Sequence, residues 1–79
     1  MESVRDILNE IKWRFNKSLK DTEIYYIHRG APGDFKTIKG DEISDLGRSF
    51  ITCGEGHIPY HRVFKIEYEE EVIFEREKR

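Results

Sequence analysis

The chain has 79 residues, of which 38% are charged, and its net charge at pH 7 is −2. A chain of this length can build one modest hydrophobic core, so we expect a single domain over residues 1–79. The near balance of charge excludes a polycationic protein that coats nucleic acid. The 37% hydrophobic and 13% aromatic content excludes bulk disorder.

The single cysteine, Cys53, points to a reducing compartment, because it cannot form an internal disulfide or a structural zinc site on its own. The N-terminus lacks an apolar signal core, and no apolar run approaches the roughly 20 residues that span a bilayer. The three histidines lack a recognisable metal-ligand spacing. We therefore expect a soluble, cytoplasmic protein with no cofactor, no metal and no membrane contact.

The first predicted element is an amphipathic helix from Ser3 to about Lys12. Ser3 can cap this helix, with Asp6 three residues later. Apolar residues recur at helical spacing and form one stripe, which comprises Val4, Ile7, Leu8, Ile11 and Phe15. Trp13 falls on the opposite side, so either the helix ends before it and the indole folds back onto the core, or the indole is exposed for a partner. We expect the first.

The remaining residues predict short strands separated by turns. The expected strands cover residues 23–28, 36–39, 49–53, 58–68 and 72–74, with a loop at 30–34, a helical turn at 42–46 and a hairpin turn at 54–56. Sequential strands of this kind form an antiparallel meander. We therefore predict an α+β, two-layer fold, in which the N-terminal helix packs on a meander of about five strands.

The dipeptide His-Arg occurs twice, each time next to tyrosine, in the strings Tyr26-Ile27-His28-Arg29 and Tyr60-His61-Arg62. The planar fork of arginine matches the oxygens of a phosphate, and histidine can donate to a phosphate or move a proton near neutral pH. Aromatic rings can stack on a base. These residue types together predict a site for a phosphate attached to a nucleoside.

Strand geometry limits how the first dipeptide can act. Adjacent residues of a regular strand point to opposite faces, so His28 and Arg29 serve one ligand only if the strand ends near His28. Gly30 supports such an end, and the free N–H groups of a glycine-containing loop can cradle an anion. An edge histidine followed by an ordinary turn is the alternative interpretation.

The second dipeptide lies within an alternating segment. Arg62 shares the parity of the apolar residues Ile58, Tyr60, Phe64, Ile66 and Tyr68, whereas Val63 falls on the other face. An unpaired cation among apolar side chains is costly. Three interpretations stay open: Arg62 pairs with a carboxylate, sits at the rim of the sheet, or belongs to a bulge that resets the alternation. Both dipeptides can serve one site only if the strand breaks near Arg62.

Several motifs occur in a distinctive order: Lys12-Trp13 at the helix end, Tyr26-Ile27-His28-Arg29-Gly30-Ala31-Pro32-Gly33, Gly40, Gly47-Arg48-Ser49-Phe50 and Ile58-Pro59-Tyr60-His61-Arg62. This order resembles the RNA cyclic group end recognition domain family, a family of small, mostly archaeal proteins long classed as uncharacterised. The resemblance spans nearly the whole chain. One departure is that the family usually follows the tryptophan with Asp-Pro, which stops the helix, whereas Arg14-Phe15 follows here.

The resemblance implies an RNA-processing or repair accessory that binds an RNA 3′ end carrying a 2′,3′-cyclic phosphate. The polar signature of the family falls on His28, Arg29, His61 and Arg62, with Arg48 alongside. We predict that the arginines of the two dipeptides hold the phosphate oxygens and that the histidines donate to phosphate or ribose oxygens. Tyr26 or Tyr60 would stack on the last base.

Two other function classes stay open at this point. Two histidines facing one phosphate can act as general base and general acid, which would make the protein a metal-independent cyclic phosphodiesterase or another RNA-end-processing enzyme. A protein-interaction adaptor that uses exposed aromatic residues would leave His28 and His61 dispensable. Turnover of a cyclic-phosphate oligonucleotide distinguishes the enzyme from the binding module.

Overall fold

The structure is a computed structural model that describes residues 3–14, 21–54 and 56–77. One helix, α1 (Val4–Arg14), precedes seven strands, which are β1 (Thr22–Ile27), β2 (Phe35–Lys39), β3 (Ile43–Leu46), β4 (Phe50–Cys53), β5 (Gly56–Pro59), β6 (Val63–Tyr68) and β7 (Glu71–Glu75). Three short 3-10 turns lie between strands: η1 (Pro32–Asp34), η2 (Gly40–Glu42) and η3 (Tyr60–Arg62). The predicted α+β class is confirmed, with seven strands in place of about five.

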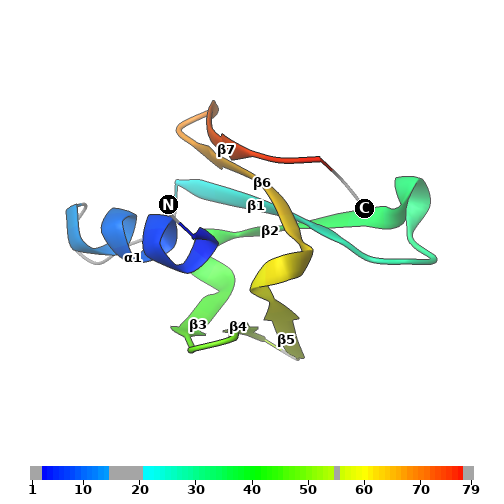
Figure 1. The fold of residues 1–79 in the computed structure, drawn as a ribbon, viewed down its shortest axis with the longest axis horizontal. Coiled ribbons are helices and arrows are strands. Elements are labelled where there is room, and N and C mark those ends of the chain that lie inside the picture. The colour runs from blue at the N-terminus through cyan, green and yellow to red at the C-terminus, as the bar shows by residue number, and fades with distance from the viewer. Residues whose placement is uncertain (1–2, 15–20, 55, 78–79) are drawn as a thin grey trace.

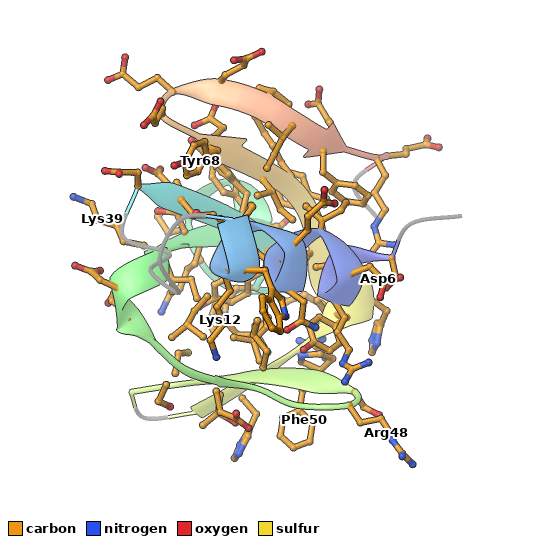
Figure 2. The ribbon with its side chains drawn as sticks, turned by 90° about the vertical axis from the view of Figure 1, so that its left-hand side faces the viewer. Asp6, Lys12, Lys39, Arg48, Phe50 and Tyr68 are labelled. Atoms are coloured by element: carbon orange, nitrogen blue, oxygen red, sulfur yellow. The ribbon has the colours of Figure 1, made fainter. Side chains whose placement is uncertain are left out.

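The strands form two antiparallel sheets, whereas the sequence predicted one meander. The four-stranded sheet has the order β2-β1-β6-β7, with β2 and β7 at its edges, and the three-stranded sheet has the order β3-β4-β5. Figure 1 shows the first sheet in the upper part of the molecule and the second below it, with η3 connecting β5 to β6. The helix lies in front of the sheets in Figure 2, between the two groups of strands.

The hydrophobic core is shared by the helix and both sheets. Its buried members are Val4, Ile7, Leu8 and Ile11 from α1, Ile24, Ile38, Val63 and Ile66 from the four-stranded sheet, and Ile51 and Ile58 from the three-stranded sheet. Burial of such aliphatic side chains contributes about 1.5–3 kcal/mol each. The helix therefore covers one face of the four-stranded sheet and leaves the opposite face to other contacts.

The helix begins as predicted and ends later than predicted. The Asp6 backbone N–H donates to Ser3 Oγ at 3.2 Å, and the Ser3 N–H donates to the Asp6 carboxylate at 3.3 Å. Because the helix continues through Arg14, Trp13 stays opposite the buried stripe and is 80% exposed, so the prediction that its indole folds back is wrong. Phe15 lies outside the described residues. In the described part of the chain, no helix is long and apolar enough to cross a membrane.

The predicted helical turn at 42–46 is wrong, because this segment pairs with β4 as strand β3. Ile43 and Leu46 lie opposite Cys53 and Ile51, with a register shift between Ile43 and Asp45. The shift brings two residues three positions apart to the same side, where both pack against the core. A bulged strand thus imitates the apolar spacing of a helix.

The predicted strand at 58–68 is also divided. Gly56–Pro59 belongs to the three-stranded sheet and Val63–Tyr68 to the four-stranded sheet, with η3 between them. A register shift opposite Tyr25 and Tyr26 then leaves Phe64 as an extra residue in β6. Val63 is therefore fully buried and Phe64 is half-buried, the reverse of the predicted alternation. The hairpin predicted at 54–56 is confirmed by the pairing of β4 with β5, although Glu55 lies outside the described residues.

Candidate functional site

A cavity of about 730 Å³ lies where three segments separated in sequence meet. These segments are the end of β1 with the loop that follows it, η3 with the start of β6, and the residues after β7. The lining residues are Ile27, Arg29, His61, Arg62, Phe64, Arg76 and Glu77. Three arginines and a histidine face one carboxylate there, so the cavity suits an anion.

The first His-Arg dipeptide splits between two sides of the sheet. Arg29 lines the cavity together with Ile27, whereas His28 is not among the lining residues. The imidazole of His28 instead meets the ring of Tyr26 edge-on, with the ring centroids 6.3 Å apart. The predicted end of the strand near His28 is present, because β1 ends at Ile27, yet only Arg29 of the dipeptide reaches the cavity.

The loop after this dipeptide is closed by backbone hydrogen bonds. The N–H of His28 donates to the carbonyl of Asp34 at 2.9 Å, and the N–H of Ala31 donates to the carbonyl of His28 at 3.3 Å. Gly30 has a φ of 94°, a conformation that costs a side-chain-bearing residue energy and a glycine almost none. This conformation turns the chain directly after Arg29, which fixes the arginine at the rim of the cavity.

The second His-Arg dipeptide enters the cavity as a pair. Both His61 and Arg62 are exposed, and both line the cavity. They lie in η3, and successive residues of a 3-10 turn are separated by about 120° instead of the 180° of a strand. Two adjacent side chains can therefore approach the same ligand. The break predicted near Arg62 is present, as a 3-10 turn.

Arg76 fixes the position of η3 from the C-terminal side. Its Nε donates to the carbonyl of Val63 and its Nη2 to the carbonyl of Tyr60, both at 2.8 Å. Its backbone N–H donates to the carbonyl of Phe64, also at 2.8 Å. One residue thus holds the carbonyl groups on both sides of the turn that carries His61 and Arg62.

Gly47 supplies a second anchor for the same turn. Its carbonyl accepts from the hydroxyl of Tyr60 at 2.7 Å and from Nε of Arg5 at 3.1 Å. A Cβ at this position would lie 2.9 Å from the carbonyl oxygen of Phe50, so a side chain here would displace the backbone. Burial raises the pKa of the Tyr60 phenol, which keeps its hydroxyl a donor at neutral pH.

The arginines of the two dipeptides are available to a ligand. Across residues 3–14, 21–54 and 56–77, neither Arg29 nor Arg62 forms an ion pair with a carboxylate, and both are exposed. Three interpretations were open for Arg62. Its place in an exposed turn agrees with the one that puts it at the rim of the sheet. Two unpaired guanidinium groups beside one cavity create a local positive potential in a chain whose net charge is negative.

Comparison with known proteins identifies the family. Residues 1–76 match the family model described as the MJ1316 RNA cyclic group end recognition domain. The chain belongs to this family. A UPF0248 protein of Methanococcus vannielii is 38% identical over 63 residues, which cover 80% of this chain and 76% of that protein. A UPF0248 protein of Thermococcus kodakarensis is 35% identical over 77 residues, covering 96% and 94%. No solved structure matches the chain.

The family resemblance predicted from the sequence is thus confirmed, and the fold shows where its polar signature lies. Arg29, His61 and Arg62 meet at the cavity, whereas His28 does not line it. Arg48 is exposed in the connection between β3 and β4, and Figure 2 shows its side chain extending outward at one end of the three-stranded sheet. The binding role of each of these family positions stays a prediction.

The two tyrosines predicted to stack on a base are both packed against the core. Burial raises the pKa of Tyr26, and Tyr60 is held by its bond to the carbonyl of Gly47. Neither ring lines the cavity. The aromatic ring that does line it is that of Phe64, which the predicted alternation placed on the apolar face.

Sequence reasoning missed Arg76, because the acidic excess of the C-terminal residues directed attention to the middle of the chain. The hairpin of β6 and β7 brings Arg76 to the start of β6, because Lys65 lies opposite Glu75 and the next pair outward joins Phe64 to Arg76. A register shift between Ile66 and Glu67 sets this pairing, so counting residues back from the turn would have assigned another partner to Phe64.

No metal site accompanies this cavity in the structure as described: its residues contain no group of three or more His, Cys, Asp or Glu that could hold a metal ion. Cys53 lies half-buried in β4, and burial raises the pKa of its thiol. A raised pKa keeps the thiol protonated and weakly nucleophilic. The side chains that line the cavity offer hydrogen-bond donors, the positive charge of three arginines, and one carboxylate, that of Glu77.

Proposed function

We propose that this protein binds the 3′ end of RNA that carries a 2′,3′-cyclic phosphate, and that the phosphate occupies the cavity described above. The observation that carries the proposal is the convergence of Arg29 with His61 and Arg62 from two distant segments. The description of the family names the recognition of RNA cyclic group ends, which supports the same ligand.

Each cavity residue has a role in this proposal. The guanidinium groups of Arg29 and Arg62 donate to the two non-bridging oxygens of the cyclic phosphate. The imidazole of His61 donates to a ribose or phosphate oxygen. Arg76 uses its side-chain donors on backbone carbonyls, so it acts as a positioning residue.

The position of His28 supports binding over catalysis. A two-histidine mechanism needs one imidazole to accept a proton and another to donate one at the same phosphate. Among the histidines in the described part of the chain, only His61 lines the cavity.

The exposed indole of Trp13 suits the adaptor alternative, in which His61 and the cavity arginines would be dispensable.

The test compares end groups on one oligonucleotide sequence. Fluorescence anisotropy of a 5′-labelled single-stranded RNA is measured with a 2′,3′-cyclic phosphate, a 3′-phosphate or a 3′-hydroxyl end. We expect the cyclic end to bind most tightly. Arg29→Ala and Arg62→Ala should each weaken binding of the cyclic end by about tenfold and of the hydroxyl end by much less.

Lys36→Ala is the control for loss of one positive charge, because Lys36 is exposed in β2 and does not line the cavity. It should leave the end-group preference unchanged. Equal losses for the cyclic and hydroxyl ends in the arginine variants would contradict the proposal. Conversion of the cyclic phosphate during the assay would show an enzyme. We place this binding in the cytoplasm, in RNA processing or repair, which agrees with the single cysteine.

A further inference from the structure

Glu77 is the acidic residue among the described residues that line the cavity, where three arginines and His61 accompany it. It directly follows Arg76, which is joined to η3 and to the start of β6 by hydrogen bonds to three backbone carbonyls. These bonds hold the chain at residue 77 beside the cavity, although β7 ends at Glu75. The family model matches residues 1–76, so family membership assigns nothing to Glu77.

The charge of this carboxylate is not cancelled by an ion pair. Within the part of the chain that the structure describes, Glu77 forms no ion pair with Arg29, Arg62 or Arg76, and its side chain is exposed. An arginine that paired with the carboxylate would offset its effect on an incoming anion, whereas an unpaired carboxylate repels that anion. The cavity therefore presents three guanidinium groups and one separate carboxylate, a net formal charge of +2 with His61 neutral.

The ends that an RNA can carry differ in the charge that this carboxylate would meet. A 2′,3′-cyclic phosphate is a diester and carries one negative charge. A 3′-phosphate is a monoester whose second pKa is about 6, so it carries nearly two negative charges above pH 7. Coulomb attraction to guanidinium groups grows with the charge of the ligand, so the arginines alone favour the 3′-phosphate. Repulsion by a carboxylate grows in the same way and opposes that preference.

We propose that Glu77 is a specificity-determining residue, which shifts the preference of the cavity from doubly charged phosphomonoester ends toward singly charged phosphodiester ends. This inference rests on the proposed function, because it concerns the phosphate that occupies the same cavity. Arg29 and Arg62 supply the attraction that both kinds of end share. Glu77 supplies a repulsion that is twice as large for a dianion as for a monoanion. The site thus recognises the cyclic group by its charge in addition to its shape.

The experiment measures how removal of this one charge changes the affinity for ends of different charge. One 5′-labelled RNA sequence carries a 2′,3′-cyclic phosphate, a 3′-phosphate or an acyclic 3′-methylphosphate diester. Fluorescence anisotropy gives each dissociation constant at about pH 7.5, where the monoester is a dianion. The salt concentration is about 10 mM, so that charges are weakly screened.

Glu77→Gln should tighten binding of the cyclic end by about threefold, the size expected for unit charges about 6 Å apart in water. The 3′-phosphate should gain about tenfold, because the energy is proportional to the charge and the fold-change for a dianion is therefore the square of that for a monoanion. The methyl diester has the charge of the cyclic end without its ring, so it should gain about threefold as well.

Two variants and one change of conditions serve as controls. Glu77→Asp keeps the charge and should leave the affinity for each end within about twofold. Glu71→Gln removes an equal charge from the other end of β7, roughly 20 Å away along the strand, and Glu71 does not line the cavity; its effect should also stay within about twofold. At about 1 M salt the Debye length falls to about 3 Å, so the gains in Glu77→Gln should disappear.

The outcomes separate the two proposals. Equal gains for the cyclic end and the 3′-phosphate in Glu77→Gln would overturn selection by charge, and the proposed function would stand if the unmodified protein still prefers the cyclic end. Weaker binding of every end in Glu77→Gln would also overturn this inference, because the carboxylate would then attract the ligand. An unmodified protein that binds the cyclic end no more tightly than the 3′-hydroxyl end would overturn the proposed function, whatever the variants do.

Discussion

His28-Arg29 lies directly after strand β1, where the chain enters a loop, whereas His61-Arg62 lies inside a three-residue 3-10 turn. Of the first dipeptide, only Arg29 lines the cavity. The turn sends both side chains of the second dipeptide to the same cavity. An identical pair of residues therefore contributes one or two groups to a site according to the local backbone geometry.

The anchoring of η3 gives the first way to test this contrast. Arg76→Ala removes two hydrogen bonds from a charged donor to the carbonyls of Tyr60 and Val63. We expect the free energy of unfolding to fall by about 2 kcal/mol, measured by urea denaturation. Amide hydrogen exchange should accelerate at residues 60–64 and stay unchanged in the loop at 28–34.

Arg62→Ala is the matched control, because it removes an exposed arginine from the same turn. Its effect on the free energy of unfolding should stay within about 0.5 kcal/mol. Equal destabilisation by both variants would mean that positive charge, and not the contacts of Arg76, holds the turn. Faster exchange in the loop at 28–34 would mean that the backbone around the first dipeptide depends on the turn that carries the second.

The histidines provide the second test. His61→Ala should weaken binding of the cyclic-phosphate oligonucleotide by about tenfold, since it removes a donor at the cavity. His28→Ala should change the same dissociation constant by less than about twofold, because its ring lies against Tyr26. Fluorescence anisotropy measures both. A loss in His28→Ala equal to that in His61→Ala would restore the two-histidine site.

The tyrosines beside the dipeptides give the third and smallest effect. Burial raises the pKa of Tyr26 and of Tyr60 in the folded protein above the ordinary value of 10.0. A raised folded-state pKa stabilises the protein fully below about pH 10, and this contribution is lost as the pH rises toward the folded-state value. Urea denaturation between about pH 8 and 11 should therefore show declining stability above about pH 10.

Phenylalanine variants separate the two tyrosines. Tyr26→Phe and Tyr60→Phe should each reduce the alkaline decline. At neutral pH, Tyr60→Phe should cost about 1 kcal/mol, because the carbonyl of Gly47 loses a donor. Tyr26→Phe should cost less, since the Tyr26 hydroxyl has no side-chain hydrogen bond to any other described residue. If the two variants lose the same free energy of unfolding at neutral pH, the hydrogen bond to the carbonyl of Gly47 does not stabilise the turn.

Local sequence signals predicted the elements whose periodicity is regular. The cap at Ser3, the apolar stripe of α1 and the hairpin turn at 54–56 follow from residue type and spacing. The same signals failed where a register shift changes the period of a strand, at Ile43–Leu46 and at Val63–Ile66. In both segments two residues that pack in or against the core lie three positions apart, a spacing that single-sequence patterns assign to a helix or to the wrong strand face.

The candidate site was predictable in its residue types and not in its geometry. Both dipeptides and the family resemblance were visible in the sequence, and so was the need for a break near Arg62. The contributions of Arg76 and Phe64 depend on pairings between distant strands and on one extra residue in β6. No local pattern encodes which side a bulge selects, so these two residues required the fold.

The edge strand β7 has a consequence for how copies of the chain meet. Val72 and Ile73 are exposed there, at 44% and 41%, which would favour strand addition by another molecule. An antiparallel pairing of two copies centred on Ile73 would place Glu71 of each strand opposite Glu75 of the other. Both ends of that pairing would bring like charges together, which is unfavourable. The carboxylates at the two ends of β7 thus protect an apolar edge from self-association.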